Sequence, residues 1–258
     1  MSRKLAELSG TAAGLALSAD SIVVLPLGAI EHHGPHLPLM TDHLIADSVA
    51  NASVEAAATA GLDIWILPTI AYTKSDEHHW AAGTMWISWD TLMRTIVELG
   101  SAIAATGATK LVFFNGHGGN LALLQVASRE LRRRFGLQTF LMGATVPAGA
   151  HDGPEELGLG IHAGHAETSL VLHLRPDLVD LSLAERSVPE HLDGYEHIGF
   201  KKRVTFGWLS NDFGTNGTLG DPTGASAEYG RELFDLSVAE AVAAFAEVAR
   251  FDAAGGSA

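Results

Sequence analysis

The sequence predicts an α/β fold, a three-layer α/β/α sandwich with a mostly parallel central sheet. Short, continuous apolar runs, typical of strands buried on both faces, alternate with longer Ala- and Leu-rich stretches that end near glycine. A strand–helix–strand order implies right-handed crossovers, so the helices should cover both faces of the sheet. Nothing in the composition marks a linker, and residues 1–258 are expected to form a single domain.

The elements follow in order along the chain. The predicted strands are residues 22–27, 64–70, 111–114 and 139–142. The predicted helices between them are residues 42–60, 88–106 and 120–135, with Gly61, Gly107 and Gly136 as stops. The second half of the chain is predicted to comprise an exposed loop at 147–164, a helix at 164–174, irregular structure at 182–222, a long helix at 223–250 and a frayed tail at 253–258.

The composition excludes several classes of function. Sixteen basic and thirty acidic residues give a net charge of −14, which repels nucleic acids and anionic membranes. No stretch reaches the roughly 18 apolar residues of a membrane span. We therefore expect no nucleic-acid partner and no membrane partner, and the basic run at 201–203 is predicted to be a solvated face. The chain has no cysteine and no signal-peptide pattern, so a cytoplasmic location is expected.

Polar side chains follow the first predicted strand, at the sheet edge where open parallel sheets bind ligands. Glu31 and His33 are two residues apart, so in an extended segment they point to the same side. Pro35 and Pro38 stiffen the loop that returns Asp42 toward them. These side chains could bind a metal ion. Alternatively, the loop is solvated and Asp42 caps the next helix.

Two later segments add candidate ligands. Residues 115–120, Asn-Gly-His-Gly-Gly-Asn, follow the third strand, and their glycines permit tight turns that would carry His117 over the sheet edge. A phosphate-binding loop is the alternative, but the segment lacks the dinucleotide glycine spacing and the P-loop lysine. Glu167 lies at a predicted helix start, where by itself it would be a surface acid that complements the helix dipole.

Together these positions contribute three carboxylates and two imidazoles: Glu31, His33, Asp42, His117 and Glu167. Imidazole nitrogen and carboxylate oxygen suit divalent ions of the first transition row. Five such ligands suit a pair of ions with one bridging carboxylate, a centre that activates water for hydrolysis.

The motifs resemble the creatininase (creatinine amidohydrolase) family. They are Glu-His-His-Gly-Pro-His-Leu-Pro-Leu at 31–39, Asn-Gly-His-Gly-Gly-Asn at 115–120 and His-Ala-Gly-x-x-Glu-Thr-Ser at 162–169, with further likeness at 75–78, 83–84 and 220–222. The resemblance implies a three-layer α/β fold, a homohexamer and two divalent metal ions per chain, Zn²⁺, Mn²⁺ or Fe²⁺.

The resemblance also implies roles for individual residues. Glu31 and His117 would bind one metal ion and His33 the other, with Asp42 as the bridge. Glu167 would be the acidic ligand from the late helix. His162 resembles the proton-handling residue proposed for the family, which makes it the candidate catalytic residue.

Two departures argue against creatinine as the substrate. True creatininases have Glu at the position of Gly119, and they have tryptophans in the loop before the counterpart of His162. Here no aromatic residue lies between Phe140 and Tyr195. The Gly-Gly form and His165 are more similar to family members that hydrolyse other amides, including formamide hydrolases and the mycofactocin precursor peptidase.

The leading hypothesis is a divalent-metal-dependent amidohydrolase that cleaves a C–N amide bond of a small substrate, including cyclic amides, through a metal-activated water. Alternatives are a peptidase acting on a modified precursor peptide and a non-catalytic metal-binding assembly protein. The candidate substrate-binding residues are Glu77, His78, Trp80 and Gly119. For Trp80, Trp86 and Trp89 together, a core or a subunit contact is the favoured interpretation, and a substrate wall beside the metals is the alternative.

Overall fold

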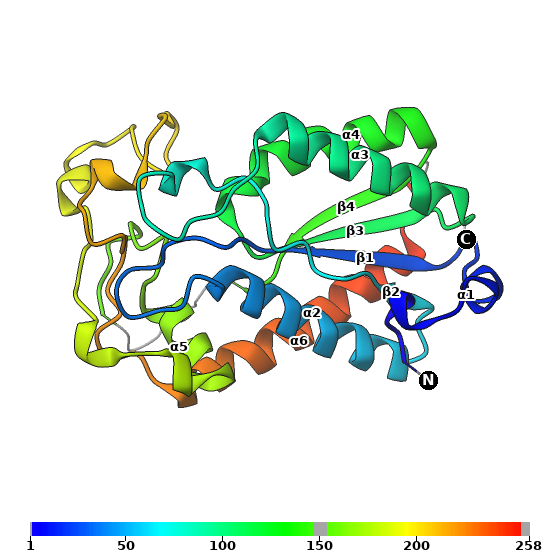
Figure 1. Cartoon of the computed structure of the whole chain (residues 1–258), viewed down its shortest axis with the longest axis horizontal. Coiled ribbons are helices and arrows are strands. Elements are labelled where there is room, and N and C mark those ends of the chain that lie inside the picture. The colour runs from blue at the N-terminus through cyan, green and yellow to red at the C-terminus, as the bar shows by residue number, and fades with distance from the viewer. Residues whose placement is uncertain (1, 147–153, 254–258) are drawn as a thin grey trace.

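The structure is a computed structural model that describes residues 2–146 and 154–253 (Figure 1). In this part of the chain, four parallel strands form one sheet in the order β2-β1-β3-β4. They are β1 (Ile22–Leu27), β2 (Ile64–Ile66), β3 (Lys110–Asn115) and β4 (Gln138–Gly143). The predicted α/β fold with a parallel sheet is confirmed.

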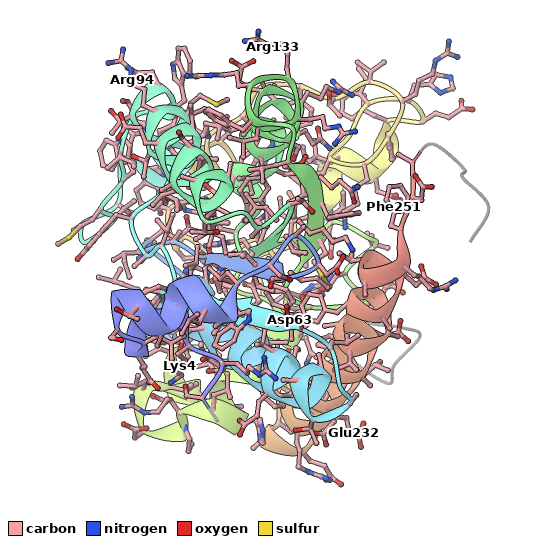
Figure 2. All side chains as sticks on the ribbon, turned by 90° about the vertical axis from the view of Figure 1, so that its right-hand side faces the viewer. Lys4, Asp63, Arg94, Arg133, Glu232 and Phe251 are labelled. Atoms are coloured by element: carbon pink, nitrogen blue, oxygen red, sulfur yellow. The ribbon has the colours of Figure 1, made fainter. Side chains whose placement is uncertain are left out.

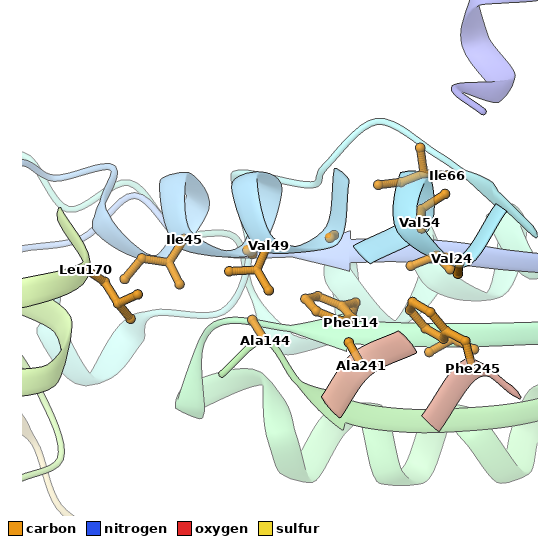
Figure 3. Packing of buried hydrophobic residues seen from close by; sticks show 14 of the residues in the cluster. Val24, Ile45, Val49, Val54, Ile66, Phe114, Ala144, Leu170, Ala241 and Phe245 are labelled. Carbon is orange, nitrogen blue, oxygen red and sulfur yellow. The ribbon is translucent and has the colours of Figure 1, made fainter. Parts of the chain in front are cut away.

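Helices cover both faces of the sheet, as the sandwich requires (Figure 1). One layer is α3 (Trp89–Ala105) and α4 (Leu121–Phe135), and the other is α2 (Thr41–Thr59) and α6 (Ala227–Arg250). Val24 and Phe114 of the sheet pack with Val54 of α2 and Phe245 of α6 (Figure 3). Because alternate strand residues face opposite sides, Phe113 belongs to the core against α3 and α4.

Most helix boundaries follow local sequence signals. Ser88 caps α3 and Ser226 caps α6, each accepting a hydrogen bond from a backbone N–H three residues on. The last helix therefore begins at Ala227, later than predicted. The predicted glycine stops all adopt positive φ, with angles of 95°, 93° and 73° at Gly61, Gly107 and Gly136.

Two elements differ from the prediction. The strand expected at 64–70 ends at Ile66, because the next donor of the ladder would be the N–H of residue 26 in β1, and that residue is Pro26. Pairing resumes at Ile70, whose N–H donates to the carbonyl of Pro26, so the segment after β2 has one residue more than β1 between the paired positions. A short helix that the sequence pattern did not predict, α1 (Gly10–Ala16), precedes β1.

The residues between β4 and α6 gather at the carboxyl end of the sheet, at the left of Figure 1. They comprise α5 (His165–Leu174) and short 3-10 turns. Of the loop predicted to be exposed, 147–153 lie outside the described residues, but 162–164 are buried. They are buried because His162 and Leu219 exchange two backbone hydrogen bonds. In the predicted tail, Ala253 is exposed and 254–258 lie outside the described residues.

Charged side chains lie at the periphery, as Arg94, Arg133 and Glu232 do in Figure 2. No helix in residues 2–146 and 154–253 combines the length and the apolar character needed to cross a membrane.

Candidate metal centre

The predicted ligands meet at the carboxyl ends of β1 and β3. The order of the sheet places β3 on one side of β1 and β2 on the other, so the winding direction of the fold changes between β1 and β3. Open parallel sheets bind ligands at this kind of position. Glu31 and His33 follow β1, His117 follows β3, and Asp42 lies in the first turn of α2. All four side chains are buried.

Two glycines allow the loops to approach α2 closely enough to bring these residues together. A Cβ atom on Gly28 would lie 2.5 Å from both the Cα and the N of His43. A Cβ atom on Gly116 would lie 2.9 Å from the carbonyl oxygen of Asp42. The first turn of α2 therefore rests directly on both loops, and only glycine fits at the two contacts.

The distances divide the ligand candidates into two groups. His33 Nε2 lies 3.1 Å from Asp42 Oδ1 and 3.9 Å from both Glu31 Oε1 and Glu167 Oε2. His117 Nδ1 lies 2.9 Å from Asp42 Oδ2 and 3.4 Å from Glu31 Oε2. Within the described residues, Glu31–Asp42–His117 and His33–Asp42–Glu167 each place three ligand atoms within 4.8 Å of one another. Asp42 belongs to both of these groups, one carboxylate oxygen facing each imidazole. Glu31, His33 and His162 form a third group within the same distance, without Asp42.

Glu167 reaches the cluster because the start of α5 is held in an unusual conformation. Ala163 has φ of 55°, a left-handed value that is uncommon outside glycine. This turn aims the N–H of Ala163 at Glu167 Oε2, to which it donates a hydrogen bond of 2.6 Å. Gly230 of α6 lets that helix lie directly against α5, since a Cβ there would collide with the carbonyl oxygen of Ser169.

Three histidines of the cluster share one hydrogen-bonding arrangement. In each of His33, His117 and His162, one ring nitrogen is paired with a backbone carbonyl and the other faces the carboxylates. The carbonyl partners are those of Glu31, Lys74 and His32, at 3.1, 2.7 and 2.8 Å. A carbonyl oxygen can only accept, so the paired nitrogen carries the proton and the inward nitrogen can offer a lone pair to a metal ion or a proton.

The charges of the cluster fit a cation. Glu31 Oε2 accepts a hydrogen bond of 2.5 Å from Ser75 Oγ, but Glu31 Oε1 has no hydrogen-bond partner among the described residues. The imidazole nitrogens of His162 and His78 lie 3.5 and 3.7 Å from Oε1, beyond hydrogen-bonding range. Burial raises the pKa of Glu31 to about 8 and also raises the pKa of Glu167. A divalent ion would supply the positive charge that these buried carboxyl groups lack.

The histidines show the complementary effect. Burial opposes the charged form of both rings. Even so, the Asp42 carboxylate raises the pKa of His33 to about 9, and Glu31 and Asp42 raise the pKa of His117 well above its ordinary value. Burial opposes the charged form of Asp42 as well, yet the two imidazoles hold its pKa below the usual range. Protons on these rings balance the carboxylates, and metal binding would replace them.

A cavity of about 570 Å³ opens onto the cluster. Three of the predicted substrate-binding residues, Glu77, His78 and Gly119, line it together with the candidate catalytic residue His162. Trp80 is not among the described lining residues, and its indole Nε1 donates a hydrogen bond of 2.7 Å to Ser210 Oγ.

Sequence reasoning missed one wall of this cavity. Phe206 and Trp208 line it, from the segment that directly follows the basic run predicted to be a solvated face. Their rings belong to a cluster with Phe200 and Phe213, with centroid separations of 5.4 to 6.4 Å. Four aromatic residues within fourteen positions of an otherwise polar, irregular segment were the available signal.

The structure also decides between alternatives left open by the sequence. Asp42 makes no capping hydrogen bond at the start of α2, because its carboxylate is turned toward His33 and His117. The sequence left open whether the tryptophans of the loop before α3 belong to the core. Trp86 and Trp89 are 43% and 66% exposed, so a core position is wrong for both.

The chain is similar to known proteins over most of its length. The sequence model of the family described as "Creatininase: Creatinine amidohydrolase" matches residues 6–245. The mycofactocin precursor peptide peptidase of Mycobacterium tuberculosis is 37% identical over 239 residues, which cover 91% of this chain and 88% of the relative. The creatinine amidohydrolase of Pseudomonas putida is 29% identical, with 86% and 87% covered. A creatininase structure described as a Zn-Zn type is 26% identical with a TM-score of 0.74, covering 96% of this chain and 98% of that one.

Proposed function

The chain belongs to the creatininase family, and on this basis we propose that it is a hydrolase that cleaves a C–N amide bond with two divalent metal ions. The observation that carries the proposal is the position of the buried Asp42, shared between two groups of carboxylate and imidazole ligands. A closed structural metal site would not require a cavity, whereas this cluster opens onto one.

Glu31 and His117 would bind one ion and His33 and Glu167 the other, with Asp42 between them. Divalent ions in such a centre polarise an amide carbonyl and lower the pKa of a water molecule. The mixed nitrogen and oxygen donors suit Zn²⁺, Mn²⁺ or Fe²⁺. The relative described as a Zn-Zn type supports zinc as the first ion to test.

We assign the transfer of a proton to His162. Its Nε2 is occupied by the carbonyl of His32, so its lone pair is on Nδ1, which faces Glu31 at the cavity wall. Burial holds the pKa of His162 well below its ordinary value, so the ring is neutral and readily gives up any proton that Nδ1 takes from the attacking water. His162 Nδ1 can then return that proton to the departing amine nitrogen, a step worth roughly 10²–10⁴-fold in rate.

The substrate that the observations support best is a peptide-type amide with an apolar or planar group beside the bond that is cleaved. Phe206 and Trp208 line the same cavity as the ligands, and aromatic side chains there suit contact with such a group. The 37% identity to mycofactocin precursor peptide peptidases supports a peptide. A small amide, including a cyclic one, is the second candidate, because a creatinine amidohydrolase is also among the relatives.

The experiment that tests the reaction is metal removal and restoration. The purified chain is dialysed against a chelator and assayed on short peptides, lactams and formamides before and after addition of Zn²⁺, Mn²⁺ or Fe²⁺. We expect hydrolysis to disappear with the metal and to return with one of these ions. Hydrolysis that survives complete metal removal, as measured by elemental analysis, would contradict the proposal.

We further propose that the chain is a cytoplasmic homohexamer, as its resemblance to the family implies. Exposed apolar residues around the loop before α3 support an interface between copies: Tyr72, Met85, Trp86 and Trp89. Light scattering should then show a hexamer for the wild type. Trp89→Glu should form a smaller assembly, because a charge at this position would oppose burial in the interface.

A further inference from the structure

A short turn beside the ligand cluster holds His117 from its outer side. The turn carries Lys74 and the 3-10 helix η2 (Asp76–His78). The carbonyl of Lys74 accepts a hydrogen bond from His117 Nε2 at 2.7 Å, and Glu77 Oε1 lies 3.3 Å from the same nitrogen. Lys74 Nζ donates to Glu77 Oε2 at 3.0 Å, so the carboxylate is tethered in this place. The Glu77 side chain is only 11% exposed.

Gly119 leaves the space that the Glu77 carboxylate occupies. A Cβ atom built on Gly119 would collide with Glu77 Oε1 and would lie 2.5 Å from His117 Nε2. Backbone conformation does not require glycine here, because Gly119 is not among the described glycines with positive φ. The neighbouring Gly118 has nothing within 4 Å of its Cβ position. Contact with Glu77 and His117 therefore distinguishes Gly119 from Gly118.

The turn is also anchored by the segment that carries Phe206 and Trp208. Ser210 is buried, and its Oγ donates a hydrogen bond of 3.0 Å to the carbonyl of Glu77. The same Oγ accepts the indole N–H of Trp80. These two bonds join the backbone of η2 to the segment that carries the aromatic wall of the cavity, so Glu77 is restrained by its backbone as well as by Lys74.

We propose that Glu77 is a positioning residue of the metal centre, and that Gly119 is glycine because the Glu77 carboxylate occupies the place of its side chain. This inference rests on the metal-binding role proposed above for His117. With a carboxylate and a carbonyl on its Nε2 side, His117 presents Nδ1 to Glu31 and Asp42 in one fixed orientation. Removing such an outer partner of a ligating histidine typically weakens metal affinity by about 10–100-fold.

The test is a double-mutant cycle on metal affinity. Wild type, Glu77→Ala, Gly119→Ala and the double variant are stripped of metal and titrated with Zn²⁺ in competition with a fluorescent chelator. We expect each single variant to bind Zn²⁺ about 10–100-fold more weakly. The loss of affinity in the double variant should be smaller than the two single losses combined, because removing the carboxylate relieves the closer collision, although the new methyl group still lies near His117 Nε2.

Gly118→Ala is the matched control, since its methyl group would enter open space and should leave affinity unchanged. Glu77→Gln keeps the side-chain size and removes the charge. It should lower Zn²⁺ affinity while the metal-free protein keeps its helical circular dichroism, whereas a purely structural role would lower stability and leave affinity unchanged. Should Gly119→Ala fail to fold, recovery of folding in the double variant would support the same contact.

Two outcomes would overturn the inference. One is wild-type affinity for Zn²⁺ in both single variants, which would leave Glu77 as a residue that contacts only substrate. The other is additive losses in the double variant, which would mean that Gly119 and Glu77 act independently. A wild type that binds no Zn²⁺, Mn²⁺ or Fe²⁺ would instead refute the proposed function, so the two failures are distinguishable.

Discussion

Replacement of Gly28 by alanine tests how the loop after β1 and the start of α2 create the ligand cluster. The added Cβ would lie 2.5 Å from the Cα and N of His43, so the two backbones must separate by about 0.9 Å to reach the 3.4 Å of an ordinary contact. Neither partner is the flexible end of a side chain. Overpacking of this kind typically costs about 1–3 kcal/mol.

The same displacement should disturb metal binding. Asp42 immediately precedes His43, so a shift of this turn moves the shared carboxylate relative to His33 and His117. Metal–ligand distances tolerate deviations of only about 0.2 Å, so the predicted shift exceeds what the centre can absorb. We expect Gly28→Ala to bind Zn²⁺ at least about tenfold more weakly than the wild type.

Two measurements separate the effects. Urea unfolding of the metal-free protein reports the packing cost, and chelator competition reports the affinity. Gly14→Ala is the control, because nothing lies within 4 Å of its Cβ position and it belongs to helix α1. There alanine should stabilise by about 0.5–1 kcal/mol. Equal stability and equal affinity of Gly28→Ala and wild type would refute the claim that close backbone approach assembles the site.

Further predictions concern single side chains. Asp42→Asn should lose both metal ions while keeping its helical circular dichroism, and elemental analysis that finds two ions per chain would contradict the bridging role. His162→Ala should keep the ions and lose roughly 10²–10⁴-fold in kcat; loss of metal would instead make His162 a ligand. Burial lowers the pKa of His36 from 6.5 to about 4, so the unfolded chain takes up the proton first as pH falls below 6.5 and the folded state loses stability down to about pH 4. Urea unfolding of metal-free His36→Gln should therefore show a fall in stability between pH 7 and pH 5 that is smaller by roughly 2 kcal/mol than in the wild type.

The sequence by itself determined the sheet, most helices and the set of candidate ligands. Continuous apolar runs such as Ile22–Leu27 can be buried only between two layers, and glycine stops such as Gly136 act through their own backbone. The end of each strand is also set by nearby residues. Since the carboxyl ends of parallel strands meet at one edge of the sheet, Glu31 and His117 could be assigned to that edge. Each of these features depends on residues within one short segment of the chain, so the order of residues in that segment is enough to predict it.

Only the tertiary structure decided what surrounds the ligands. The place of Glu77 beside Gly119 and the hydrogen bond between Trp80 and Ser210 join segments about 40 and 130 residues apart. The same is true of the wall formed by Trp208, which reaches the cavity from an irregular segment. Such contacts arise from the packing of loops with no repeating pattern, so their residue types carry no periodic signal. The distances between segments, and with them the shape of the cavity, are set when the helices pack on the sheet.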